Sequence, residues 1–315
     1  MINPKLRDFG PSNPELGTFQ GDGAPRVMPL FAPLYEVGTE LARLQWLTLQ
    51  YRTDASVLAG MLPGPLQPDD EPEVVIWIAR FLSATFERDG QTLKELDPYT
   101  QAGVDLRCRF AGASGAFPLV SYITGLNHGI TGRELFGLPK KQASRVTLNH
   151  TSARVEAEVV TADGTQVVGA RGFFRGVEAD DHTAGSDGPT ACNPHLDLVP
   201  AWMTRQLTAK VIPSATGTGY DVAQLVHVPF EFSAERDVVS LDAQLELGGS
   251  ANDPIDALGV RGPISARWGF TDLRVLFGTY LAPLDLGQAK GGRISRTVDG
   301  MDSDVASLPA DGSSS

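Results

Sequence analysis

Alternation of apolar and polar residues dominates the middle of the chain and predicts β-strands. The segments 44–52, 104–112 and 227–247 alternate in this way, and 74–87 is a continuous apolar and aromatic run that turns into alternation. Alternation places every second side chain on one face of a strand, which is typical of a half-buried antiparallel sheet. We therefore expect strands to build most of the core.

Turn residues indicate how these strands connect. The segment 152–176 predicts a hairpin, because two alternating runs flank Asp163-Gly164 and Asp-Gly is a favoured hairpin turn. The segment 227–247 repeats this pattern with a longer, charged connection between its two runs.

Few helices are expected, and all of them are short. Asp54 is a plausible N-cap for a helix over 55–62, and 250–253 resembles the capped start of a helix over 255–258. A further helix is expected within 194–207. The predicted fold class is therefore mainly β (α+β), an antiparallel β-barrel with a few short helices.

The chain is expected to form one large domain. Residues 1–30 are rich in Pro, Gly and polar groups and predict an N-terminal arm, and 291–315 predict a disordered tail. The domain between them spans 31–290, and the loop 182–194 could mark a sub-domain break.

Charge and composition exclude several classes of protein. The 315 residues include 26 basic and 38 acidic side chains, which gives a net charge of -12. This balance argues against nucleic-acid and anionic-membrane partners. The chain has no run of about 18 apolar residues, no apolar signal-peptide core and no CxxC pair, so a cytoplasmic protein without a cysteine metal site is expected.

The sharpest chemical feature is the segment 132–141, which reads GRELFGLPKK. Pro139 favours an extended backbone before it, and Lys140 begins a predicted strand over 140–148. Successive side chains of a strand point to opposite faces, so one of Lys140 and Lys141 points into a barrel.

A lysine inside a barrel gains chemical value from its burial. A free lysine is only about 0.04% neutral at pH 7, and only the neutral amine attacks a ketone to form an iminium. Desolvation lowers the pKa of an amine, and we expect it to outweigh the contribution of Lys141 on the opposite face. The alternative use of a Pro-Lys-Lys triplet is an exposed turn.

The motif Gly-Arg-Glu-x-x-Gly-x-Pro-Lys-Lys resembles the active-site signature of the acetoacetate decarboxylase family. Weaker similarities in the same order extend the resemblance over roughly 43–285. They are Tyr51-Arg52-Thr53-Asp54, Asp70-Glu71-Pro72, Tyr99-Thr100-x-x-Gly103, 207–213 and 253–260. The resemblance implies a β-cone or barrel with a buried pocket, assembly into homo-oligomers, Lys140 as the Schiff-base lysine and Lys141 as its neighbour. It implies no cofactor beyond the covalent lysine–substrate imine.

The resemblance also marks departures around the expected pocket. The family has glutamate after Tyr-Thr, where this chain has Gln101, and a second family glutamate aligns with Trp77 or a close neighbour. The family arginine that meets the substrate carboxylate aligns with Leu44, which leaves the adjacent Arg43 as the candidate clamp.

Other residues are candidates for substrate binding. Arg107 and Arg109 share a strand face with Asp105, either in the barrel or on an exposed sheet face. Tyr99 and Tyr122 could orient an iminium or pack in the core. Glu134 matches the motif glutamate, and an ion pair with an arginine is its alternative role; His128 is a loop residue or a proton shuttle.

Together these features predict a cofactor-free lyase that acts on a small keto acid, with acetoacetate decarboxylase-like chemistry through a Lys140 iminium. The first alternative is an aldolase-dehydratase that condenses a keto acid such as pyruvate with an aldehyde through the same lysine. The second is a barrel that binds a small molecule without catalysis.

Overall fold

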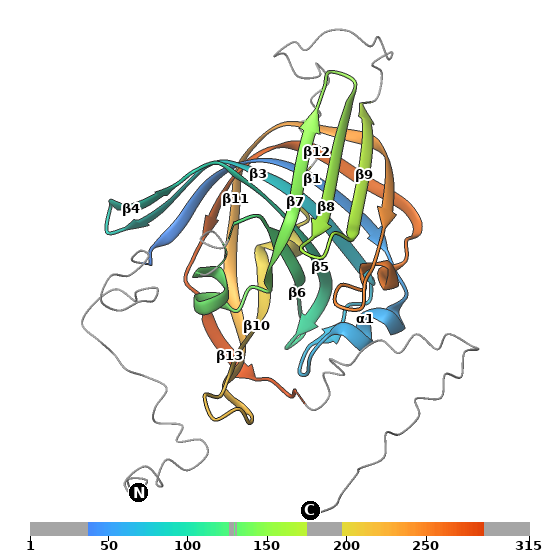
Figure 1. Cartoon of the computed structure of the whole chain (residues 1–315). Helices are drawn as coiled ribbons and strands as arrows, with labels where there is room; N and C mark the ends of the chain where they lie inside the picture. Colours follow the sequence, from blue (N-terminus) through green and yellow to red (C-terminus); the bar gives the residue numbers. More distant parts are fainter. Residues whose placement is uncertain (1–36, 126–128, 130, 175–196, 287–315) are drawn as a thin grey trace, which may run out of the picture.

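The computed structural model describes residues 37–125, 129, 131–174 and 197–286, which fold as a mainly β structure with short helices (Figure 1). This agrees with the predicted fold class. The expected arm (1–30), the loop 182–194 and the expected tail (291–315) lie outside the described residues.

The strands and helices alternate unevenly along the chain. The strands are β1 (Thr39–Arg52), β2 (Gln67–Pro68), β3 (Glu73–Arg88), β4 (Gln91–Leu96), β5 (Tyr99–Phe110), β6 (Ala113–Ile123), β7 (Lys140–His150), β8 (Arg154–Thr161), β9 (Gln166–Phe174), β10 (Arg205–Pro213), β11 (Tyr220–Leu247), β12 (Arg261–Val275) and β13 (Thr279–Pro283). The helical segments are α1 (Ala55–Met61), a π-helical turn η4 (Gly132–Phe136) and the 3-10 turns η5 (Ala201–Thr204) and η6 (Ile255–Leu258).

The strands form one sheet that closes on itself. The hydrogen-bonded order β6-β7-β8-β9-β11-β12-β1-β3-β5 returns to its start because β5 also pairs with β6. β10 joins β6 to β11, β4 extends β3, and β13 lies beside β11 (Figure 1). The pairs β6–β7 and β6–β10 are parallel, and the other pairs are antiparallel. Closure removes most of the unpaired sheet edge, which explains how a mainly β chain of this size protects its backbone groups.

The two faces of the sheet bury separate apolar clusters. On β1, Leu47 and Leu49 belong to one cluster, whereas Leu44 and Trp46 belong to the other. This is the alternation that the sequence shows over 44–52. The cluster that contains Leu44 and Trp46 surrounds the cavity described below.

One predicted connection is a bent strand. The charged stretch within 227–247 was expected to join two strands, but β11 continues through it. The register with β12 shifts between Ser233 and Arg236 and again between Arg236 and Val239, and Ala234 and Asp237 have positive φ. Such bulges turn a strand without ending it, so β11 pairs in succession with β10, β12 and β9.

The hairpin at Asp163-Gly164 and the helical segments α1, η5 and η6 lie where the sequence predicts them, whereas η4 was not predicted. Asp54 stands at the N-cap of α1, but its side chain makes no cap bond and instead pairs with Arg261 at 2.9 Å. Among the described residues, none of the helices has the length and apolar character needed to cross a membrane.

Candidate active site

Lys140 lies at the centre of the candidate site. It is the first residue of β7, it pairs with Ser121 of β6, and only 8% of its surface is exposed. A cavity of about 50 Å³ lies on one side of it and a second of about 20 Å³ on the other. Four residues line both cavities: Glu40, Leu138, Lys140 and Val275. The amine is therefore enclosed between two small hollows.

The motif before Lys140 explains how the chain enters β7. Gly137 ends the turn η4 in the left-handed region, at φ 73°, and its N–H bonds back to the carbonyl oxygens of Arg133 and Gly132. A Cβ at Gly137 would lie 2.5 Å from the Cα of Lys210 on β10. Glycine is thus required both by the backbone conformation and by the close approach.

Gly132 and Arg133 act directly on the lysine. A Cβ at Gly132 would lie 3.0 Å from the Cε and 3.3 Å from the Nζ of Lys140, so the absent side chain leaves room for the amine. The Arg133 guanidinium donates a hydrogen bond to the Lys140 carbonyl oxygen at 2.5 Å. The motif therefore fixes the lysine from its backbone and from its tip.

Burial sets the electrostatics of Lys140. Desolvation lowers the pKa of the Lys140 amine, and the nearby Glu40 carboxylate acts in the opposite direction. Burial raises the pKa of Glu40, against the effects of Lys140 and of a hydrogen bond with Tyr99. The Tyr99 ring stacks on Phe81 with ring centres 4.3 Å apart, which fixes its position. The neutral amine is thereby more populated than in an exposed lysine.

Lys141 points to the other face of the sheet, as strand alternation predicts. Its Nζ donates to Asp253 Oδ1 at 2.6 Å and to the Asn252 carbonyl at 2.9 Å. The Tyr122 hydroxyl donates to the same Asp253 oxygen at 2.8 Å. Lys141 and Tyr122 therefore meet at the buried Asp253 carboxylate, outside the residues that line the cavity, and the Lys141 side chain is 40% exposed. Lys141 is not among the causes that shift the pKa of Lys140.

A single row of paired residues crosses the sheet at the lysine. Trp77 of β3 pairs with Gly103 of β5, Gly103 pairs with Ser121 of β6, and Ser121 pairs with Lys140. Gln101 lies two residues from Gly103 on the same face of β5, lines the larger cavity, and is 5% exposed. Its Oε1 has no hydrogen-bond partner among the described residues, so it is available to a ligand.

Asp105 places a second carboxylate at the same cavity. The Trp77 indole occupies the space that a side chain at Gly103 would fill, with a Cβ there only 2.4 Å from the ring. The indole N–H donates to Asp105 Oδ2 at 2.5 Å. Burial raises the pKa of Asp105 to about 6, against the lowering effects of the Trp77 indole N–H and the Gln206 side chain. The position expected from the resemblance to be a family glutamate therefore holds an indole that orients an aspartate.

Most of the remaining walls of the larger cavity are apolar, with Ser121 and Gln206 as further polar lining residues. Trp46 lies between Trp77 and Phe232, with ring centres 5.4 and 5.3 Å away. The other apolar lining residues are Phe81, Pro118, Leu138, Met203, Phe230, Leu273 and Val275. Lys140, Glu40 and Asp105 are the charged side chains among the described residues that line this cavity. Their interactions are strengthened by the low local polarity.

The structure does not bring Arg43 to the cavity. Its side chain is 62% exposed, and its Nε lies 3.8 Å from Asp272. Arg43 is on the face of β1 opposite to Glu40, Leu44 and Trp46, because strand neighbours alternate. Arg43, the expected carboxylate clamp, is therefore not among the residues that line the cavity, and an apolar residue, Leu44, occupies the inward position.

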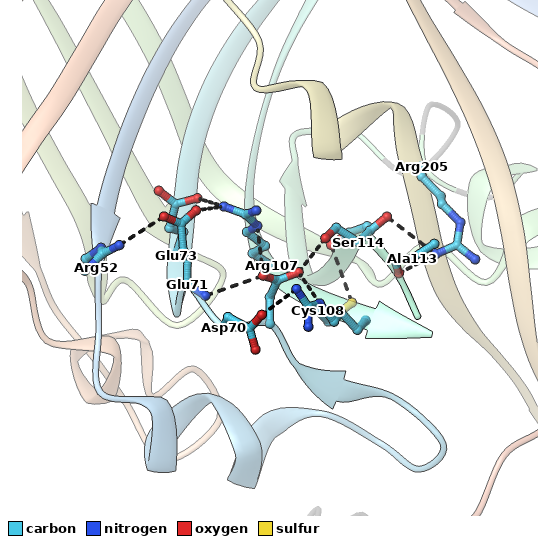
Figure 2. Close-up of polar contacts among 12 residues, drawn as sticks. Arg52, Asp70, Glu71, Glu73, Arg107, Cys108, Ala113, Ser114 and Arg205 are labelled. Carbon is cyan, nitrogen blue, oxygen red and sulfur yellow. Dashed lines mark hydrogen bonds and ion pairs between the residues drawn. The ribbon is translucent and has the colours of Figure 1, made fainter. Parts of the chain in front are cut away.

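Arg107 is also held elsewhere. Figure 2 shows its guanidinium directed at Glu71 and Glu73, with Nη1 2.7 Å from Glu73 Oε2. Its Nε lies 3.5 Å from Asp69, which also pairs with Arg109 at 3.2 Å. These arginines bind carboxylates of their own chain at the far end of β5, beyond Asp105, and neither is among the residues that line the larger cavity.

Glu134 is exposed on η4, and His128 lies outside the described residues. Sequence reasoning missed Glu40 and did not assign Asp105 to the pocket. For Asp105 a signal existed, because Tyr99, Gln101, Gly103 and Asp105 alternate on one face of a strand. For Glu40, which precedes the alternating run 44–52, the sequence contained no such signal.

A closed β ring with a desolvated lysine amine at an internal cavity defines the class of this protein. The family model of acetoacetate decarboxylase (ADC) matches residues 27–284. The chain belongs to the acetoacetate decarboxylase family.

Individual relatives agree with this assignment. Acetoacetate decarboxylase of Burkholderia cenocepacia is 27% identical over 258 residues, which cover 80% of this chain and 92% of the relative. The crystal structure of acetoacetate decarboxylase from Legionella pneumophila has a TM-score of 0.64 at 20% identity and covers 84% of this chain and 94% of its own. A second similar structure is the enduracididine biosynthesis enzyme MppR complexed with the condensation product of pyruvate and imidazole 4-carboxaldehyde. It has a TM-score of 0.58 at 15% identity and covers 83% of this chain and 99% of its own. At these identities the two solved structures support the fold.

Proposed function

We propose that this protein is a cofactor-free lyase that decarboxylates a small β-keto acid through an iminium on Lys140. The observation that carries the proposal is the buried Lys140 amine, whose pKa is lowered by desolvation and which lies between two cavities. The 27% identity to an acetoacetate decarboxylase supports the reaction type.

Glu40 has a defined part in this proposal. It takes a proton from the Lys140 ammonium, which releases the neutral amine to attack the ketone. The carbinolamine then loses water as Glu40 returns the proton. In the resulting iminium, the β-carboxylate leaves as CO₂ and its bonding electrons form an enamine. Protonation at carbon and hydrolysis release the ketone and regenerate Lys140.

The walls of the cavity favour loss of CO₂. The charge of the substrate carboxylate is localised in the ground state and dispersed in the transition state, so an apolar site lowers the barrier relative to water. Trp46, Phe230 and Phe232 supply such walls. The volume of about 50 Å³ is several times the roughly 10–15 Å³ that one water molecule requires, which suits a substrate of few heavy atoms.

An aldolase-dehydratase is the second candidate. Gln101 stands where the resembled family has glutamate, and its unpartnered Oε1 lines the cavity. An amide can orient a keto acid but cannot exchange a proton near neutral pH. MppR, which shares the fold, holds a condensation product of pyruvate. In this reading the enamine of pyruvate attacks an aldehyde, and the aldol loses water.

Parallel product assays separate the candidates. The purified chain is supplied with acetoacetate, or with pyruvate and an aromatic aldehyde, and CO₂ and the conjugated condensation product are measured. We expect CO₂ from acetoacetate and its loss in Lys140→Ala, with retention in Glu134→Gln as the control at an exposed position. Condensation without CO₂ would replace the first candidate with the second. If neither product forms, the non-catalytic binding barrel is favoured.

We extend the proposal to assembly, since the resemblance implies a homo-oligomer. Light scattering of the full chain is expected to give a mass above that of one 33.6 kDa chain, and a monomer would reject this part.

A further inference from the structure

We propose that Asp105 is a second catalytic acid–base group, which exchanges a proton with the substrate carbon, and that Trp77 is its positioning residue. This inference rests on the proposed function, because it requires a substrate held on Lys140. It divides the proton transfers of the site between two carboxylates: Glu40 serves the lysine nitrogen, and Asp105 serves carbon.

The geometry of Asp105 is that of a carboxylate fixed by a hydrogen bond rather than that of one partner in a structural ion pair. The residue is 2% exposed and lines the larger cavity. One oxygen, Oδ2, accepts the Trp77 indole N–H at 2.5 Å. The other, Oδ1, is buried and has no hydrogen-bond partner among the described residues. A buried acceptor without a partner costs free energy, so its retention at a cavity points to a ligand that uses it.

The position of Asp105 relative to Lys140 suits transfer to carbon. Gly103 belongs to the row that leads through Ser121 to Lys140, and Asp105 lies two residues, roughly 7 Å, further along β5. Lys140, Trp77 and Asp105 all line this cavity, and the Trp77 ring fills the space over Gly103. A substrate attached to the Lys140 nitrogen and extending through the cavity beside the Trp77 ring therefore brings its reacting carbon toward Asp105.

The two carboxylates of the cavity have different surroundings. Glu40 faces Lys140 and the Tyr99 hydroxyl, whereas Asp105 faces the Trp77 N–H and Gln206. The other charged groups that line the cavity are Glu40 and Lys140. A pKa of about 6 keeps a useful share of Asp105 in each protonation state near neutral pH. Separate environments of this kind let two acids take separate roles.

The proposed step is balanced in atoms and charge. The enamine carbon takes the proton of the Asp105 carboxylic acid, and the nitrogen lone pair forms the C=N bond of the iminium. Asp105 is left as a carboxylate, and it regains a proton from water after the ketone leaves. In the reverse direction the carboxylate removes a proton from the carbon beside the iminium.

Hydrogen exchange at that carbon tests the inference. The full chain is incubated in D₂O with acetone or pyruvate, whichever the wild-type protein binds covalently. Deuterium uptake into the methyl group is divided by the amount of imine that borohydride traps. We expect Asp105→Asn to trap the same amount of imine while exchange per imine falls about 10²–10⁴-fold. Unchanged exchange per imine would overturn the inference, whereas the absence of any adduct in the wild type would instead reject the proposed function.

Trp77→Phe provides the matched variant and a readout that a purely structural role would not move. Exchange per imine requires the carboxylate and should therefore rise as the pH passes about 6. Removal of the indole N–H destabilises the carboxylate, so this rise should shift upward by roughly one pH unit. An unshifted rise would overturn the role of Trp77. If Asp105→Asn fails to fold, this shift alone decides whether Asp105 is the titrating base.

Discussion

Gly132 lies directly against the tip of Lys140, and a Cβ at this glycine would stand 3.3 Å from the reactive Nζ. The contact atoms belong to the end of a flexible side chain, so an added methyl group moves the amine rather than the backbone. The glycine therefore sets where the amine lies between the two cavities.

Gly132→Ala should reduce activity more than stability. We expect kcat to fall about 10–100-fold, because small displacements of a reacting group are costly, with little change in the melting temperature. The matched variant is Gly137→Ala, where the left-handed backbone and the Lys210 Cα at 2.5 Å predict a loss of about 1–3 kcal/mol or more in unfolding free energy. Thermal melts and kinetics of both variants decide; equal losses of stability would contradict this account.

Glu40→Gln should move the pH dependence of imine formation to lower pH. The Glu40 carboxylate raises the pKa of Lys140, against the stronger effect of burial. Without that charge the amine loses its proton at lower pH, so the neutral form is present further into the acid range. The rate of adduct formation measured from pH 5 to 9 checks this, with Glu134→Gln as the unshifted control. A shift to higher pH would show that Glu40 does not act on Lys140 as a charge.

Arg43→Ala should leave the KM for the keto acid within about twofold of the wild type. The side chain is exposed and on the face of β1 opposite to the cavity. Gln101→Leu changes a residue that lines the cavity. It should raise KM or lower kcat by about tenfold or more, because the substrate loses a buried hydrogen bond with the Gln101 amide. Steady-state kinetics of the two variants test whether the structure or the sequence alignment places the substrate-binding residue. A large effect at Arg43 would favour the alignment.

Asp69→Asn should destabilise the fold and weaken its acid sensitivity. The Asp69 side chain is 1% exposed, accepts the Ser114 hydroxyl at 2.5 Å and pairs with Arg107 and Arg109. Burial alone would raise its pKa, but these hydrogen bonds and charges together hold the pKa below its usual 3.8. The stabilisation is complete above that usual value and is lost as the pH falls through the lower folded-state pKa.

Denaturant titrations from pH 2 to 7 measure this effect. We expect the variant to lose about 3–5 kcal/mol near neutral pH, as for the removal of one partner from a buried ion pair. Glu158→Gln, which breaks a more exposed pair with Arg145, should cost less than about 1 kcal/mol. Equal losses in the two variants would contradict the structural role of Asp69.

The sequence predicted what local rules govern. Alternation over 44–52 and 104–112 gave the strands and the residues that share each face, and strand alternation placed Lys140 and Lys141 on opposite faces of β7. Alternation and turn residues gave the mainly β fold class, and the resemblance through the lysine motif implied the family's β-cone or barrel.

The rest of the site depends on register, which no local pattern contains. Glu40 reaches the cavity beside Lys140 because β1 begins at Thr39, five residues before the alternating run. Asp105 lines the pocket because β5 pairs with β3 and β6 in a register that puts Gly103 in the row of residues leading to Lys140. Arg107, the next residue on the same face of β5, lies past the cavity among carboxylates. The single bent strand β11 likewise depends on bulges set by its partner β12.

The identity of the lysine that forms the imine tests the central claim most directly. The protein is incubated with acetoacetate or pyruvate, reduced with borohydride and digested, and the modified peptide is sequenced by mass spectrometry. The account predicts one stable adduct, on Lys140, that is absent in Lys140→Ala and retained in Lys141→Arg. An adduct on Lys141 or Lys210, or none with either keto acid, would contradict it.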